Sequence, residues 1–278
     1  MKRLALIIAV FGSLLFPAVT YAGNNSYSYD LIKTGFIVNE DSTVSVSETQ
    51  NFDFKGEYHK GWRSILMDGI DEVTDISVTD NGTGKSLVKS NHSLDKTDPD
   101  SWGKYYVSKN DGRTNIEWYY DAADEKKSWT LKYKIHGLIG FYNDGDSFYI
   151  DVIGDEYAAA VGAVEAEVTL PAGAGAGISI AEAYTRVRES GIFEEKNISG
   201  VIDGDKISFS YGAIDSGVPF TIKVGWPEGF VNRRAYWSYF IGRIWQWPAA
   251  VIFAVLAVFA IKAYHKKERE GKGVIVPQ

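Results

Sequence analysis

Apolar and polar residues alternate in short segments along most of the chain, and this pattern constrains the fold more than any other feature. Tyr27 and Tyr29 alternate with polar residues, and Val44 and Val46 continue the alternation after a turn at 39–42. Period-two alternation is typical of strands with one buried face. Because the segments are short and almost no helical period precedes the C-terminal apolar segment, the sequence predicts a mainly β protein, an antiparallel β-sandwich.

Turn residues separate further segments of this kind. Asn81-Gly82 suits a tight hairpin turn because both residues tolerate positive φ, and aspartate-glycine pairs at 144–145 and 203–204 also mark turns. The other strands that we expect lie at 115–120, 128–139, 147–152, 161–170, 177–187, 206–211 and 218–226. Residues 171–177 alternate glycine and alanine after a proline, which is typical either of a hinge between two β subdomains or of a flexible loop.

The N-terminus has the three parts of a secretory signal peptide. Lys2 and Arg3 supply charge, an apolar core follows over 4–19, and Ala18 and Ala22 offer small side chains to a signal peptidase. We expect residues 1–22 to be removed by cleavage after Ala22. The alternative is a retained anchor helix, because the core is near the lower length limit for spanning a bilayer.

Residues 236–264 have the composition of a single transmembrane helix. The apolar run after Pro248 is short for a bilayer core of about 30 Å, but the aromatic-rich residues before it extend the helix. Trp237, Trp245 and Trp247 are typical of an aromatic belt at the lipid headgroups, and the basic residues of 265–278 place this tail in the cytoplasm. The alternative is a buried helix of a soluble domain.

Residues 23–232 then form an extracytoplasmic domain. The chain has no cysteine, which excludes disulfides, thiolate metal sites and cysteine nucleophiles. Residues 23–232 contain 19 Lys and Arg and 34 Asp and Glu, a net charge of −15. Nucleic acid is therefore not an expected partner, whereas the lipid bilayer is contacted through the C-terminal helix.

Short motifs resemble catalytic or phosphate-binding sequences but lack their context. The Gly-Lys-Ser at 84–86 lacks the earlier glycine and the following helix of a phosphate-binding loop. Ser101 and Lys104 have the spacing of a serine nucleophile and its lysine, but the surrounding proline and glycine favour a loop over the required helix. Residues 177–181 resemble a nucleophile elbow, although the alternating isoleucines predict a plain strand.

Histidines and carboxylates are the remaining candidates for metal or acid–base chemistry. The four histidines show no metal-binding spacing. Acidic residues cluster at 68–75, 95–100 and 143–156, which is typical of solvated turns and also of extracellular calcium sites. We expect no cofactor, with calcium as the alternative. Glycoside hydrolysis requires two carboxylates at a defined distance from each other, and the sequence does not give that distance.

The segment 52–65 is the most distinctive part of the exported region. A glycine-flanked loop with Tyr58 and Trp62 is followed by Arg63, and the preceding strand carries Glu48. The planar guanidinium of Arg63 can satisfy a partly buried carboxylate, so we expect a structural ion pair between Arg63 and Glu48. The alternative is a partner-binding surface of Tyr58, Trp62 and Arg63, because Trp and Arg dominate interface hot spots.

Several short motifs follow one another in a distinctive order along the exported region. They include Tyr29-Asp-Leu-Ile, Phe52-Asp-Phe, Trp62-Arg63-Ser-Ile65, Trp129-Thr-Leu-Lys-Tyr-Lys and Val224-Gly-Trp-Pro-Glu-Gly-Phe. In this order they resemble the YciQ-like family of predicted bacterial membrane proteins. The resemblance implies an extracytoplasmic domain of unknown function followed by a membrane helix, and it transfers no catalytic or binding residue. The resemblance also implies that further membrane segments follow the first one. This chain departs from that pattern, because 17 residues follow Ile261.

We therefore expect a single-pass protein of the bacterial cell membrane, with the β domain outside and the C-terminus in the cytoplasm. The β domain would be a non-catalytic recognition or assembly module with a protein partner in the membrane or envelope. One alternative is a hydrolase of envelope glycans or peptides, which requires acidic residues, or Ser101 and Lys104, to converge in one cleft. The other is a ligand sensor that works through a membrane partner, because the short tail cannot fold into an output domain.

Overall fold

The computed structural model describes residues 25–189 and 192–239, together with positions 241, 242, 252, 255, 256, 258, 261 and 262. The predicted signal peptide at 1–22 and the predicted tail at 265–278 lie outside these residues, as does most of the predicted transmembrane helix at 236–264. Within the described positions, no helix is long and apolar enough to span a bilayer.

The largest element is an eight-stranded sheet, and the prediction of a mainly β protein is confirmed. β1 (Ser26–Val38) and β2 (Val44–Lys55) form the expected antiparallel hairpin, and β1 also pairs in parallel with β12 (Val164–Thr169). The strand order is β15-β16-β12-β1-β2-β9-β4-β5. The remaining strands are β4 (Glu72–Asp80), β5 (Lys85–Ser86), β9 (Lys126–His136), β15 (Val201–Asp203) and β16 (Lys206–Tyr211).

Two smaller sheets complete the domain. The four-stranded sheet has the order β3-β8-β7-β6, with β3 (Glu57–Leu66), β6 (Val88–Lys89), β7 (Lys104–Asn110) and β8 (Arg113–Ala123). The five-stranded sheet has the order β10-β11-β17-β13-β14, with β10 (Gly140–Tyr142), β11 (Gly145–Ile153), β13 (Ile180–Glu189), β14 (Ile192–Ser199) and β17 (Phe220–Trp226). Short 3₁₀ helices are η1 (Pro99–Ser101) and η2 (Ala174–Gly177).

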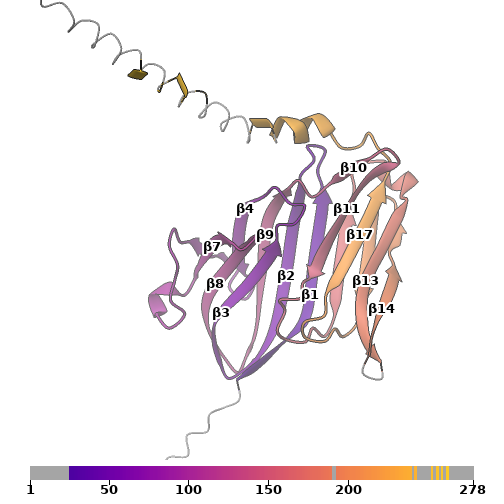
Figure 1. Ribbon diagram of the computed structural model, residues 1–278. Helices are drawn as coiled ribbons and strands as arrows, with labels where there is room; N and C mark the ends of the chain where they lie inside the picture. Colours follow the sequence, from indigo (N-terminus) through magenta and orange to yellow (C-terminus); the bar gives the residue numbers. More distant parts are fainter. Residues whose placement is uncertain are drawn as a thin grey trace, which may run out of the picture.

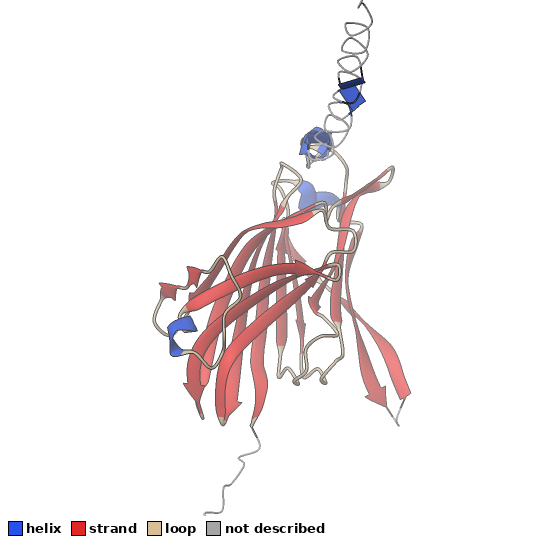
Figure 2. Ribbon diagram, turned by 60° about the vertical axis from the view of Figure 1, so that its left-hand side comes forward, coloured by secondary structure: helices blue, strands red, loops and turns tan. Residues whose placement is uncertain are grey.

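Both smaller sheets cover the same face of the eight-stranded sheet. The ring of Phe52 in β2 lies 6.4 Å from Trp118 of β8, and the ring of Phe36 in β1 lies 5.9 Å from Phe148 of β11. Phe36 is opposite Val46, which shares the buried face of β2 with Phe52. The molecule therefore has two layers, the second of which is divided between the four-stranded sheet (on the left in Figure 1) and the five-stranded sheet (on the right), as Figure 2 shows from another side.

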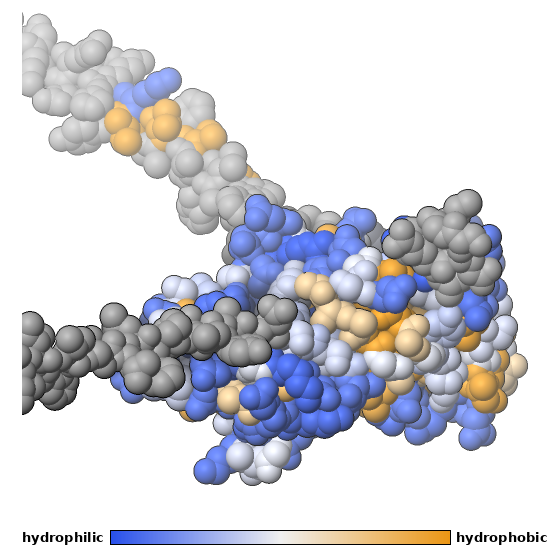
Figure 3. Space-filling model, turned by 90° about the horizontal axis from the view of Figure 1, so that it is seen from below, coloured by the Kyte–Doolittle hydropathy of each residue, from blue (hydrophilic) through white to orange (hydrophobic). Residues whose placement is uncertain are grey.

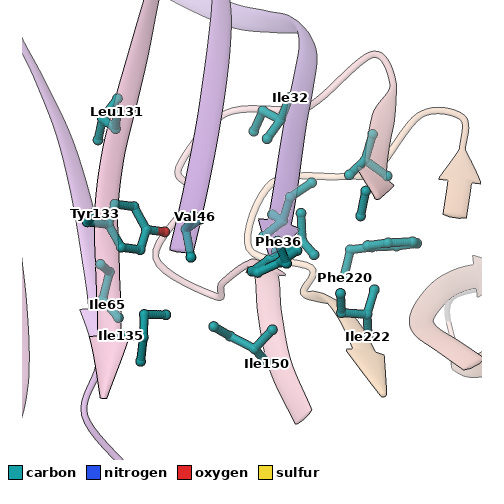
Figure 4. Packing of buried hydrophobic residues seen from close by; sticks show 14 of the residues in the cluster. Ile32, Phe36, Val46, Ile65, Leu131, Tyr133, Ile135, Ile150, Phe220 and Ile222 are labelled. Carbon is teal, nitrogen blue, oxygen red and sulfur yellow. The ribbon is translucent and has the colours of Figure 1, made fainter. Parts of the chain in front are cut away.

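The core between the layers is apolar and rich in aromatic rings. Trp118, Trp129 and Trp226 are fully buried, and aliphatic side chains from both layers surround Tyr133 (Figure 4). Removing this much apolar surface from water is the main stabilising contribution available to a domain without cysteine.

The structure corrects the loop expected before Arg63, because Glu57–Leu66 is the strand β3. The glycine that suggested a turn serves close packing instead. Gly61 lies against the indole of Trp118, where a Cβ atom would approach the ring to 2.3 Å. A glycine inside a strand can mark such a close approach as well as a turn.

The glycine and alanine run at 171–177 connects β12 of the eight-stranded sheet to β13 of the five-stranded sheet. The carboxylate of Asp205 accepts hydrogen bonds from the backbone N–H groups of Gly173 and Gly175 at 2.9 and 2.7 Å. Gly175 also lies against the backbone of Gly204. The run is a packed corner between two sheets.

A helical segment at 233–239 lies against one end of the domain (top of Figure 1). The guanidinium of Arg233 is 2.9 Å from the carboxylate of Asp146, which is 1% exposed. The ring of Tyr239 stacks on His136 with centroids 4.5 Å apart, and its hydroxyl donates to Glu72. The segment is thereby fixed to the end of the domain that carries β10.

We expect Gly61→Ala to lower the free energy of unfolding by about 1–3 kcal/mol, because the added methyl group overpacks the indole of Trp118. Urea unfolding followed by tryptophan fluorescence measures the change. Gly35→Ala in β1 is the matched control, since its Cβ would meet nothing closer than 4.0 Å. An equal loss in both variants would contradict this account.

We also expect the thermal midpoint to fall between pH 7 and pH 5 because of His136. Burial, helped by the charge of Lys134 and partly offset by Glu72, lowers the pKa of His136 below its ordinary value of 6.5. Because the pKa of His136 is lower in the folded than in the unfolded protein, the neutral imidazole contributes stability above pH 6.5. This contribution is lost as the pH falls through the pKa of the folded state. His136→Gln should flatten the pH dependence, and an unchanged slope would exclude His136 as its source.

Candidate functional site

The predicted site residues lie on two facing strands. Tyr58, Trp62 and Arg63 belong to β3, and Glu48 belongs to β2 of the opposite layer. Alternation along β3 sends Arg63 into the interior and leaves Trp62 partly exposed on the other side. Within the described part of the chain, β3 has a hydrogen-bonded neighbour on one side only, β8, so it is an edge strand.

Arg63 and Glu48 meet in the interior. Nε of Arg63 is 2.9 Å from Oε2 of Glu48, and the two residues are 4% and 0% exposed. Nη1 is 2.7 Å from the carboxylate of Glu156, and Nη2 donates to the backbone carbonyl of Asp151 in β11 at 3.1 Å. One guanidinium therefore connects all three sheets. The expectation that Arg63 also faces a partner is corrected, because its side chain is buried.

Two tyrosines and the side-chain amide of Gln50, which donates to Oε1, complete the shell around Glu48. The hydroxyls of Tyr133 and Tyr157 donate to its two carboxylate oxygens at 3.2 and 3.0 Å. Burial raises the pKa of both phenols far above the ordinary range, so they stay protonated donors. Burial alone would lower the pKa of Arg63, but Glu48 and the neighbouring Tyr157, Tyr133 and Glu156 together more than offset it, and the pKa is raised. This arrangement satisfies the buried charges.

A groove of about 360 Å³ lies between β3 and β11, above this ion pair. Three of its four carboxylates have partners: Glu156 faces both Arg63 and Arg113, Asp155 faces Arg113, and Asp151 accepts from the hydroxyl of Thr221, whereas Asp68 has no such contact within the described part of the chain. Engaged carboxylates of this kind stabilise the packing of strands and are poorly placed for acid–base chemistry.

A second depression, which we call the aromatic pocket, has a volume of about 300 Å³ and opens along the first half of β3. Tyr58 stacks on Phe54 at 5.0 Å and packs edge-on against Tyr27 at 5.4 Å. Its lining residues come from β1, β2, β3, β8 and two loops: Asn25, Tyr27, Tyr29, Phe52, Phe54, Glu57, Tyr58, His59, Lys60, Gly61, Trp62, Lys96 and Tyr120. The structure thus brings Tyr58 and Trp62 to one pocket and separates Arg63 from it.

Tyr120 is a residue of this pocket that sequence reasoning missed. It is 7% exposed, and its hydroxyl has no hydrogen-bond partner among the described residues. Burial raises the pKa of the phenol far above its ordinary value, so the hydroxyl remains a donor. Buried hydroxyls without a partner are uncommon because each one costs free energy. The alternation in 116–120 predicts its burial but carries no signal for the missing partner.

The residues of the motifs that resemble catalytic sequences do not come together in the described part of the chain. Ser101 ends η1 and is buried, whereas Lys104 begins β7, so the helical spacing that would join them is absent. Lys85 and Ser86 form the short strand β5. Asp95 and Asp98 accept hydrogen bonds from backbone N–H groups of their own turns. Among the described residues, no three histidine or acidic side chains gather closely enough to hold a metal ion.

Comparison with known proteins gives one family and distant structural likenesses. The sequence profile described as "Predicted membrane protein (DUF2207) N-terminal domain" matches residues 30–226. No curated protein matches the chain. Similar solved structures include an M1 zinc metallopeptidase from Deinococcus radiodurans (10% identity, TM-score 0.35, 72% of this chain and 42% of that chain) and leukotriene A4 hydrolase from Saccharomyces cerevisiae (9%, 0.39, 73% and 30%). The chain spans less than half the length of these enzymes, and the low TM-scores carry no functional argument.

We expect Arg63→Ala to lower the free energy of unfolding by about 3–5 kcal/mol, because Glu48 would stay buried without its partner. Arg113→Ala is the matched control. Its contacts with Asp155 and Glu156 are partly exposed and 3.5–3.8 Å long, so the loss should stay below about 1 kcal/mol. Denaturant titration of both variants decides the point, and similar small losses would argue against a structural role for Arg63.

Proposed function

Because this chain belongs to the DUF2207 family of predicted membrane proteins, we propose that it is a membrane-anchored, non-catalytic recognition module. Residues 23–232 form an extracytoplasmic β-sandwich, and 236–264 anchor it with the C-terminus in the cytoplasm. The signal-like residues 1–22 and the basic tail support this orientation. The order of motifs from Tyr29 to Val224 supports a place among YciQ-like members.

The aromatic pocket is the observation that carries this proposal. Tyr58 and Trp62 line it and are only partly buried, although they lie on an edge strand of a well-packed domain. Partly exposed Tyr and Trp side chains around a depression are the residue types that dominate binding hot spots. In the neighbouring groove, Glu156 and Asp151 are engaged in ion pairs and a hydrogen bond, which favours binding over hydrolysis.

The position of the pocket favours a partner outside the bilayer. β1 runs from Ser26, near the pocket, to Val38, near the helical segment that precedes the proposed anchor. A strand of this length spans roughly 40 Å, so the pocket lies toward the far end of the domain (Figure 1). Figure 3 views the molecule from that end. The net charge of −15 in residues 23–232 argues against nucleic acid as the partner.

Site-directed photo-cross-linking in intact membranes tests this function. A photo-reactive amino acid replaces Lys60 at the pocket, and in the control it replaces Lys206, an exposed residue of β16. We expect a discrete adduct from position 60 alone, reduced at least tenfold by Tyr58→Ala together with Trp62→Ala, because the apolar contact surface is removed. Circular dichroism checks that the variant folds. An adduct that is insensitive to the double substitution, or none at position 60, would overturn the proposal.

A further inference from the structure

We propose that the aromatic pocket receives an apolar side chain of an extended peptide, whose backbone pairs with the free edge of β3. This inference rests on the proposed function and names the class of partner. It follows from the edge position of β3, from the unpartnered hydroxyl of Tyr120 and from the charges at the rim of the pocket.

The free edge of β3 offers backbone groups to an added strand. β8 occupies one side of β3, and the other side borders the pocket along Glu57–Trp62. Edge strands bind extended peptides through main-chain hydrogen bonds, while pockets for alternate side chains give specificity. Pairing is restricted to the middle of β3, because Asn25 already donates to the carbonyl of Glu57 and Arg63 donates to that of Ser64.

The walls of the pocket select an apolar group. Rings of β1, β2 and β3 line the space, and several of them pack at centroid distances of 4.5–5.7 Å: Tyr27, Tyr29, Phe52, Phe54 and Tyr58. Such walls gain free energy by excluding water from an aliphatic or aromatic side chain.

The hydroxyl of Tyr120 requires an acceptor. It is buried, it lines the pocket, and it has no partner among the described residues. A backbone carbonyl beside the inserted side chain supplies that acceptor, whereas a pure hydrocarbon cannot. A donor left unpaired in the free protein and paired in the complex favours binding.

Among the described residues, the rim carries one unpaired charge of each sign. Lys60 is paired with Glu117 at 2.8 Å, whereas Lys96 and Glu57 are exposed and form no ion pair within the described part of the chain. An acidic residue next to the apolar one would face Lys96. A saccharide is the alternative class of ligand, because the lining also holds polar side chains such as Asn25, His59 and Lys60, and the experiment below separates it from a peptide.

Two capped peptides and one sugar test the inference on the full-length protein in detergent by isothermal titration calorimetry. The peptides are acetyl-Thr-Val-Glu-Phe-Val-Thr-amide and the same peptide with Ala in place of Phe, and the sugar is a tetramer of N-acetylglucosamine. We expect the Phe peptide to bind at least tenfold more tightly than the Ala peptide, and the sugar not to compete.

Tyr120→Phe separates a binding role from a structural one. We expect its thermal midpoint to be unchanged or raised, because an unsatisfied hydroxyl is removed, and its affinity for the Phe peptide to fall about fivefold to tenfold. Tyr105→Phe is the matched control: its buried hydroxyl donates to the carbonyl of Ile76 at 2.6 Å outside the pocket, so it should lose stability and keep affinity.

Equal affinity for the two peptides, no binding of either, or binding of the sugar alone would overturn the peptide inference. If the cross-link from position 60 still depends on Tyr58 and Trp62 in any of these cases, the recognition function stands with another class of ligand. If that dependence is also absent, both proposals fail.

Discussion

The buried pair of Arg63 and Glu48 is the interaction on which the arrangement of the three sheets depends. A guanidinium in the interior requires acceptors for its donors, and those of Arg63 are met by Glu48 of β2, the carbonyl of Ser64 in β3 and the carbonyl of Asp151 in β11. Each sheet supplies part of the same shell. Separating any one of them would leave a buried charge or donor unsatisfied, which costs far more than a lost surface contact.

The geometry of the aromatic pocket follows from this pair. Because Arg63 points inward, alternation along β3 turns Trp62 outward, and Gly61 lies flat on the indole of Trp118. The first half of β3 is thereby held beside β1 and β2, with Tyr58 stacked on Phe54. The hydroxyl of Tyr120 is one of several buried polar atoms without a hydrogen-bond partner among the described residues, and it is the hydroxyl that lines the aromatic pocket. Such local costs tend to persist where a protein binds something.

The candidate site was only partly accessible from the sequence. Tyr58 and Trp62 could be named from residue type and their density in one segment, and Arg63 could be matched with Glu48 because a planar fork suits a carboxylate. That Arg63 is buried, and therefore absent from the proposed binding surface, depends on how β3 faces β2. Tyr120 could not be found at all, since the lack of a hydrogen-bond partner is a property of the packed environment and not of the segment that carries the residue.

Local sterics explain what the sequence by itself determined. Side-chain alternation and turn residues act over a few positions, so they were enough to predict a mainly β protein, the hairpin of β1 and β2 and the turns at Asp144-Gly145 and Asp203-Gly204. Only the tertiary structure decided how the strands divide among three sheets, and that Gly61 lies within a strand. Those outcomes depend on contacts between residues far apart in the chain, such as Gly61 with Trp118 and Arg63 with Glu156, and no local pattern encodes them.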